Sequence, residues 1–212
     1  MRHMGKMTPL EPDAFMTLRA NARVIEADRY GEKVLLLPDD TYLKLFRRKR
    51  LLSSAGLYPY AQRFADNLRA LQHRGIPCPE LVTLYRIQAM ARDVVHYRPL
   101  VGTTLRHRLR APLSLDEANQ LRHMLGAFVA RLHHLGVYFR SLHLGNVVLT
   151  PDGRLGLIDV SDMSTQQRPL GRIKRARNMK HLLRYADEAA WIHAGGLFTA
   201  AYRDGATTRH TR

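Results

Sequence analysis

Apolar and polar residues alternate in short runs through the first part of the chain, a pattern that favours β-strands. Three such runs, each bounded by turn residues, cover residues 22–30, 32–37 and 41–46. Because side chains alternate between the two faces of a strand, the third run places Tyr42, Lys44 and Phe46 on one face. We therefore expect a meander of strands that carries a lysine in its middle.

A helical pattern follows these strands. Pro59 suits the first turn of a helix, and Gly75 suits its end. Between them, Phe64, Leu68 and Leu71 form an apolar stripe at helical spacing. Two further strand-like runs lie at residues 81–87 and 91–97.

The second half of the chain predicts mostly helices. The clearest helix begins at Ser114, which forms a capping box with Glu117, and it ends at Gly136. A short basic helix and a long helix are expected at residues 104–110 and 172–194. Between them, a hairpin made of residues 147–150 and 154–160 turns at Pro151-Asp152-Gly153.

These elements predict an α+β protein with two lobes. The expected divisions are an irregular lead-in at residues 1–20, a β-rich N-terminal lobe with one helix at residues 21–99, a reduced helical C-terminal lobe at residues 100–200 and a polar tail at residues 201–212.

Composition and charge narrow the class of protein. With 45% apolar and 25% charged residues, the chain of 212 residues has the make-up of a globular protein. Its 34 Lys and Arg oppose 18 Asp and Glu, which gives a net charge of +16. Such a surface attracts nucleic acid, anionic lipid or phosphorylated sugar, although solubility or a GC-rich genome accounts for the excess equally well.

Two features of the sequence bear on the cellular location of the protein. The single cysteine, Cys78, cannot form a disulfide within the chain. The sequence also contains no apolar run long enough for a transmembrane helix. We expect a cytoplasmic protein, for which peripheral attachment to an anionic membrane by charge is an option.

The candidate chemistry lies around the hairpin. Asn146 precedes its first strand and Asp159 ends its second, so the hairpin brings both to the mouths of paired strands. An amide oxygen and a carboxylate there can coordinate Mg²⁺, which prefers hard oxygen ligands. Lys44, if it faces inward, needs an anion.

This order of residues resembles the catalytic and metal-binding loops of protein kinases. Lys44 matches the strand lysine that holds the phosphates, and Arg140 matches the arginine of the His-Arg-Asp triplet. Asn146 matches the catalytic-loop asparagine, and Asp159 matches the metal-binding aspartate. The resemblance implies a kinase-like bilobal fold that binds ATP and Mg²⁺.

Three shorter segments are similar to a bacterial branch of these proteins, the lipopolysaccharide core heptose and Kdo kinase family and its toluene-tolerance-labelled relatives. They are residues 42–46, 75–77 and 132–137, and the resemblance covers about residues 20–195. It implies transfer of a phosphoryl group from ATP to a sugar hydroxyl of an anionic lipid-linked saccharide or another phosphorylated substrate. The implied location is the cytoplasmic face of the bacterial inner membrane.

The sequence departs from the kinase pattern at the catalytic base. Ser141 stands where kinases have the catalytic aspartate, and Phe139 stands where they have the histidine. A serine hydroxyl is no general base by itself, so His143 is the nearest candidate for that role. The other interpretations are that the base is dispensable or that the chain is a pseudokinase.

Other positions are also open to two interpretations. Asp66, the single carboxylate of the helix that begins near Pro59, is either the ion-pair partner of Lys44 or a surface charge. His133 and His134 are expected at a helix end, where the helix dipole favours them, rather than at a metal site. The basic residues 172–177 form either a solvated face or a phosphate-binding patch.

Three hypotheses for function follow, and whether the chain is an enzyme depends on them. The first is an ATP-dependent kinase of a saccharide. The second is a pseudokinase that binds nucleotide or a partner and regulates envelope biogenesis. The third, a nucleic-acid-binding protein, ranks last because only charge suggests it and aromatic residues make up 8% of the chain.

Overall fold

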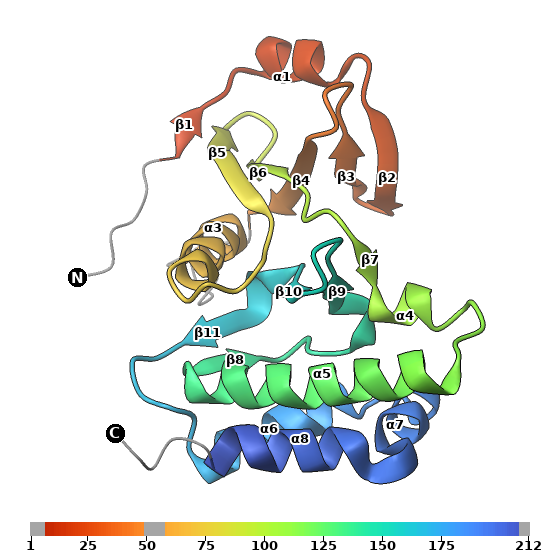
Figure 1. Cartoon of the computed structure of the whole chain (residues 1–212). Helices are drawn as coiled ribbons and strands as arrows, with labels where there is room; N and C mark the ends of the chain where they lie inside the picture. Colours follow the sequence, from red (N-terminus) through yellow and green to blue (C-terminus); the bar gives the residue numbers. More distant parts are fainter. Residues whose placement is uncertain (1–6, 49–57, 208–212) are drawn as a thin grey trace. The chain divides into compact units, whose positions relative to one another are not determined.

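A computed structural model describes residues 7–48 and 58–207 of the chain. The fold is mixed α+β, with strands and several helices, as the sequence predicted (Figure 1). The described residues form two compact units. The first comprises residues up to His73 together with Cys78–Leu100, and the second comprises Arg74–Pro77 together with residues from Val101 onward.

The first unit is built on a six-stranded sheet with the order β1-β5-β6-β4-β3-β2. Its strands are β1 (Thr8–Pro9), β2 (Arg23–Asp28), β3 (Gly31–Leu36), β4 (Tyr42–Arg47), β5 (Glu80–Ile87) and β6 (Arg92–Arg98). All neighbours pair antiparallel except β1 and β5, which pair parallel. The five strands expected from the alternating pattern are therefore all present.

The two faces of this sheet differ in character. One face buries an aliphatic core that includes Leu43 and Leu45 of β4. The opposite face of β4 carries the aromatic ring of Phe46, which packs against Phe64 of α3 (Tyr60–Gln72) at 6.3 Å between ring centroids. Lys44 shares this face, because it alternates with the buried leucines, as expected.

The expected irregular lead-in is wrong for much of its length. Residues 12–19 form helix α1 (Pro12–Arg19), with proline in its first turn, and Phe15 inserts into the aliphatic core with 1% of its surface exposed. The helix is only two turns long, so packing of Phe15 and of the partly buried Leu18 on this core stabilises it. Residues 1–6 of the expected lead-in lie outside the described residues.

The second unit combines helices with two small sheets, β10-β9-β7 and β11-β8. Its helices are α4 (Leu105–Arg108), α5 (Leu115–His134), α6 (Arg172–Leu182), α7 (Ala186–His193) and α8 (Leu197–Thr207). Its strands are β7 (Thr103–Thr104), β8 (Val137–Phe139), β9 (Val147–Leu149), β10 (Leu155–Leu157) and β11 (Met163–Thr165). The predicted capping box between Ser114 and Glu117 at the start of α5 is confirmed.

Two expectations about the end of the chain need correction. The long helix predicted at residues 172–194 is divided into α6 and α7, because the chain turns at Tyr185 and buries Glu188 against the loop that follows β8. The tail expected from residue 201 continues instead as α8, which packs closely on α5 at Gly126. Residues 208–212 lie outside the described part of the chain.

Candidate active site in the second unit

The β9–β10 hairpin positions two of the predicted metal ligands. Val147 pairs with Leu157 across the hairpin, and the backbone N–H of Ile158 donates to the carbonyl oxygen of Asn146 at 3.1 Å. Asp159 is the next residue after Ile158. At the open end of the hairpin, Asn146 therefore directly precedes β9, and Asp159 follows β10 by two residues.

Asn146 is held firmly in this position, with 8% of its surface exposed. Its side-chain Nδ2 donates to the carbonyl oxygen of Ser141 at 2.9 Å, and its backbone N–H donates to the carbonyl oxygen of His143 at 2.9 Å. Because the amide nitrogen serves the loop, the amide oxygen Oδ1 is the atom that remains for a ligand.

Asp159 has an unusual backbone conformation. Its φ of 52° and ψ of 48° lie in the left-handed region, which costs a residue with a side chain about 1–2 kcal/mol. Aspartate tolerates this region better than most residues, yet such conformations gather at functional sites. The strand predicted to run to residue 160 thus ends at Leu157, and the turn sets the direction of the Asp159 carboxylate.

Ser141 forms a short hydrogen bond that sequence reasoning did not anticipate. Its hydroxyl donates to Oδ2 of Asp162 at 2.6 Å. The second carboxylate oxygen of Asp162, Oδ1, is buried and has no hydrogen-bond partner within the described residues. A signal was present in the sequence, because Asp162 follows Asp159 by three residues in an Asp-Val-Ser-Asp segment.

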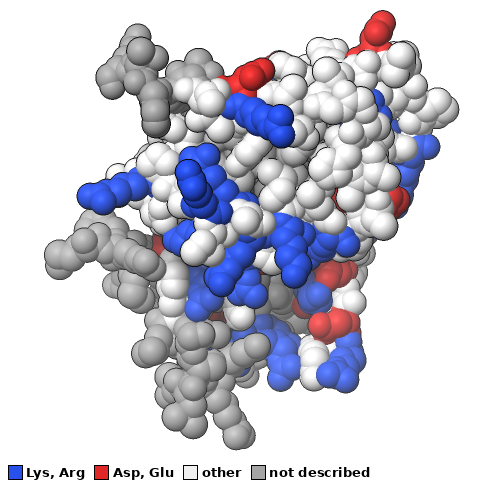
Figure 2. All heavy atoms as spheres, turned by 90° about the horizontal axis from the view of Figure 1, so that it is seen from below, with Lys and Arg blue, Asp and Glu red and all other residues white. Residues whose placement is uncertain are grey.

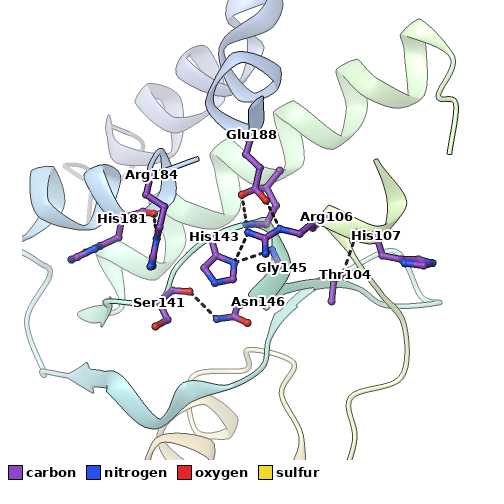
Figure 3. A network of polar contacts seen from close by, with 11 residues as sticks. Thr104, Arg106, His107, Ser141, His143, Gly145, Asn146, His181, Arg184 and Glu188 are labelled. Carbon is purple, nitrogen blue, oxygen red and sulfur yellow. Dashed lines mark hydrogen bonds and ion pairs between the residues drawn. The ribbon is translucent and has the colours of Figure 1, made fainter. Parts of the chain in front are cut away.

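His143 has a structural task in the loop (Figure 3). Its Nδ1 accepts from the backbone N–H of Gly145 at 3.1 Å and lies 3.3 Å from Nη2 of Arg106. Both partners are donors only, so Nδ1 carries no proton and the proton of the neutral ring is on Nε2. Burial, followed by the charges of Arg106 and Arg184, lowers the pKa of His143. This arrangement leaves the ring poorly placed to act as the general base.

A partly buried ion pair stabilises the loop. Glu188 of α7 is 5% exposed and accepts from Nε of Arg106 at 2.5 Å and from the backbone N–H of Leu144 at 3.1 Å (Figure 3). The guanidinium of Arg106 lies 4.6 Å from the ring centroid of Tyr185. Sequence reasoning missed Glu188, because it lies 44 residues beyond the loop that it stabilises.

A second buried network holds the strand before the loop. Asn178 of α6 donates through Nδ2 to the carbonyl oxygen of Phe139 at 2.6 Å, and its Oδ1 lies 3.1 Å from Nε2 of His133. Nδ1 of His133 lies 2.8 Å from the hydroxyl of Tyr202. Burial lowers the pKa of His133 to about 4. The expectation that the helix dipole explains this histidine is therefore wrong, because a neutral ring gains little from the dipole.

Arg140 stands in the same loop. Its carbonyl oxygen accepts from Nη2 of Arg184 at 2.8 Å, and the residue is exposed. The second unit therefore brings together five residues predicted for the site: Arg140, Ser141, His143, Asn146 and Asp159.

Lys44 and Asp66 belong to the first unit. Nζ of Lys44 lies 5.7 Å from the ring centroid of Phe64 and 5.9 Å from that of Phe46. Asp66 accepts from the hydroxyl of Tyr58, from Nε2 of Gln62 and, at 3.1 Å, from Nη1 of Arg69. Its carboxylate is thus part of a local network around α3.

The oxygen ligands at the hairpin suit a metal ion that also binds phosphate and water. In residues 7–48 and 58–207, no group of three or more His, Cys, Asp or Glu is arranged to hold a metal ion. Asn146 and Asp159 supply two oxygen atoms. Mg²⁺ is commonly held in this way, by one or two protein oxygens together with phosphate and water.

Within the described residues, no helix has the length and apolar character needed to cross a membrane.

Comparison with known proteins assigns no family to the chain. No model of a known protein family matches the chain, and no curated protein matches it.

Proposed function

We propose that this protein is a kinase-like phosphotransferase that moves the γ-phosphoryl group of Mg²⁺-ATP to the hydroxyl of a saccharide. The observation that carries the proposal is the open end of the β9–β10 hairpin, where Asn146 and a left-handed Asp159 present oxygen ligands. Phosphoryl transfer needs mainly positioning and charge stabilisation, because its transition state involves little covalent participation by the protein.

Each residue of the site has a separate role in the proposed reaction. Asn146 and Asp159 would hold Mg²⁺, and the ion would supply positive charge to the phosphates of the nucleotide. Lys44 binds phosphate oxygens, so the proposal includes a bilobal kinase-like arrangement in which both units contribute to nucleotide binding. His143, Arg106 and Glu188 fix the loop that carries Ser141 and Asn146, which keeps the reacting groups in position.

The charge of the protein supports an anionic acceptor. Lys and Arg side chains gather on the face shown in Figure 2. Residues 163–186, which include the exposed helix α6, contain seven Lys and Arg and no Asp or Glu. A phosphorylated or lipid-linked saccharide fits such a surface, and so does peripheral contact with an anionic membrane.

Binding of Mg²⁺-ATP tests the proposal. We would compare the wild type, Asp159→Asn and the control Asp116→Asn at about 0.15 M salt, where nonspecific attraction is screened. Asp116 is an exposed carboxylate in the first turn of α5, so its variant makes the same change in charge on another element. We expect Asp159→Asn alone to weaken binding at least about tenfold, a loss of about 1.4 kcal/mol. Equal binding by all three proteins, or binding that persists in EDTA, would contradict the proposal.

A pseudokinase is the second candidate, and one observation favours it. Ser141 replaces the catalytic aspartate of kinases, and its hydroxyl is bound to Asp162. Both candidates bind nucleotide through Asp159, but only the enzyme releases phosphate from ATP or transfers it. Turnover, rather than binding, separates the two.

A further inference from the structure

The Ser141–Asp162 pair lies in the candidate site but has no role so far. The two side chains come from separate segments, the loop after β8 and the 3₁₀ turn (Val160–Asp162) after the hairpin. Their hydrogen bond, 2.6 Å between Oγ and Oδ2, has the length usual for a hydroxyl that donates to a carboxylate. Ser141 also carries the carbonyl oxygen that binds the Asn146 amide, so the pair is rigidly connected to a proposed metal ligand.

Two properties of the pair suit proton transfer. A hydroxyl donates one hydrogen bond and keeps two lone pairs, so Ser141 can accept a proton while it donates its own to Asp162. Asp162 has a buried oxygen, Oδ1, without a donor among the described residues. A buried oxygen without a hydrogen-bond partner is uncommon in folded proteins, and a catalytic role is one explanation for such an atom.

We propose that Asp162 is the proton acceptor of the phosphotransfer reaction and that the Ser141 hydroxyl relays the proton to it. The inference rests on the proposed function. It assigns a carboxylate from position 162 to the task that the missing aspartate at position 141 performs in kinases. Asp162 acts through Ser141, which touches the acceptor hydroxyl.

The step balances without another reactant besides Mg²⁺-ATP and the acceptor alcohol. The acceptor oxygen forms a bond to the γ-phosphorus, and the bond from that phosphorus to the β,γ-bridging oxygen breaks, so ADP leaves. The acceptor proton passes to Oγ of Ser141, and the original Ser141 proton passes to Oδ2 of Asp162. The protonated Asp162 then loses its proton to water by the reverse path.

The other groups near the loop are already engaged. Nδ1 of His143 accepts from Gly145 and faces Arg106, so a proton cannot reach it without breaking those contacts. The Asp159 carboxylate is assigned to Mg²⁺ in the proposed function. Asp162 is thus the carboxylate that the structure leaves for the proton.

The experiment uses water as the acceptor and measures phosphate released from Mg²⁺-ATP by the full chain. Asp162→Asn is the main variant, because an asparagine Oδ1 can still accept from the Ser141 hydroxyl but cannot take its proton. The double variant Ser141→Asp/Asp162→Asn moves the carboxylate to position 141 and keeps a hydrogen bond between the two positions. Asp116→Asn is the control, and Mg²⁺-ATP affinity is measured for every protein.

We expect Asp162→Asn to lower kcat by about 100-fold or more, as for loss of a general base, with Mg²⁺-ATP affinity within about threefold of the wild type. The double variant should recover most of the lost kcat. If the Ser141–Asp162 hydrogen bond only stabilises the loop, it persists in Asp162→Asn and turnover does not change. Wild-type turnover by that variant would therefore contradict the proposed proton relay.

Three other results would also count against the relay. If kcat of the double variant stays as low as that of Asp162→Asn, a carboxylate at position 141 or 162 does not determine the rate. If phosphate is found covalently on Ser141, the hydroxyl is an acceptor rather than a relay. If the wild type binds Mg²⁺-ATP through Asp159 but releases no phosphate, the relay fails while the nucleotide site stands. Absence of Asp159-dependent binding would instead remove the proposed function itself.

Discussion

Each unit contains a buried carboxylate in an ion pair, and the two pairs span very different distances along the chain. In the first unit the buried carboxylate of Asp93 pairs with Arg86, seven residues away on the neighbouring strand. In the second unit the buried carboxylate of Glu188 pairs with Arg106, 82 residues away, and also binds the loop that carries the site. The sheet unit therefore follows from local alternation, whereas the loop of the second unit depends on contacts between distant segments.

Two glycines of the second unit give the largest expected effect. Gly136 and Gly153 have similar left-handed φ values, 71° and 76°. A Cβ at Gly136 would lie 2.2 Å from the carbonyl oxygen of Gln166, whereas a Cβ at Gly153 meets nothing within 4 Å. We expect Gly136→Ala to lower the free energy of unfolding by about 4 kcal/mol and Gly153→Ala by about 1 kcal/mol. Urea unfolding measures both, and equal losses would show that the close approach at Gly136 has no energetic weight.

The buried His133 predicts a dependence of stability on pH. Its pKa in the folded protein is about 4 and its ordinary value is 6.5, so between these values the unfolded chain binds the proton and the folded chain does not. Stability contributed by this residue is therefore complete above pH 6.5 and declines as pH falls toward 4, by roughly 3 kcal/mol. His133→Gln should flatten this part of the unfolding profile, and the exposed His123→Gln should not. Parallel profiles for the two variants would refute the assignment.

Removing one carboxylate from each unit compares their ion pairs directly. Glu188→Gln should cost about 2 kcal/mol, less than a fully buried pair, because Arg106 remains 38% exposed. Glu80→Gln should cost less than about 0.5 kcal/mol, because Glu80 and Arg98 are 63% and 61% exposed. Unfolding in urea provides the measurement. Losses of the same size would mean that burial of the Glu188 carboxylate does not strengthen its ion pair.

Lys44 should have a small effect on stability. Its ammonium group lies near the rings of Phe46 and Phe64, so Lys44→Met loses a cation–π contact but keeps an apolar stem of similar length. We expect a change below about 1 kcal/mol in the free energy of unfolding. The affinity for Mg²⁺-ATP should fall about tenfold or more if Lys44 binds phosphate. Unchanged affinity would remove Lys44 from the proposed site without affecting Asn146 or Asp159.

In both units, local features were predictable from the sequence, whereas contacts between distant segments were not. The strands around Lys44 and the capping box of α5 were predictable, because periodicity and capping are local properties. Asn146 and Asp159 were found because they flank a hairpin whose turn is visible in the sequence. Asp162, Asn178 and Glu188 were missed, because their partners lie 21, 39 and 44 residues away and no local pattern reports such contacts. Helix α1 was missed for a related reason, since packing of Phe15 and Leu18 on the core of the first unit stabilises this short helix.

Hydrogen exchange of the wild type with and without Mg²⁺-ATP locates the bound nucleotide without any substitution, and so tests whether it binds at the hairpin. The account predicts slower exchange at backbone amides of residues 141–147 and 157–162. It predicts no change in the hairpin turn at residues 151–153. Protection confined to the basic helix α6, or Mg²⁺-ATP binding with no protection near Asn146 and Asp159, would contradict the account and show that charge alone attracts the nucleotide.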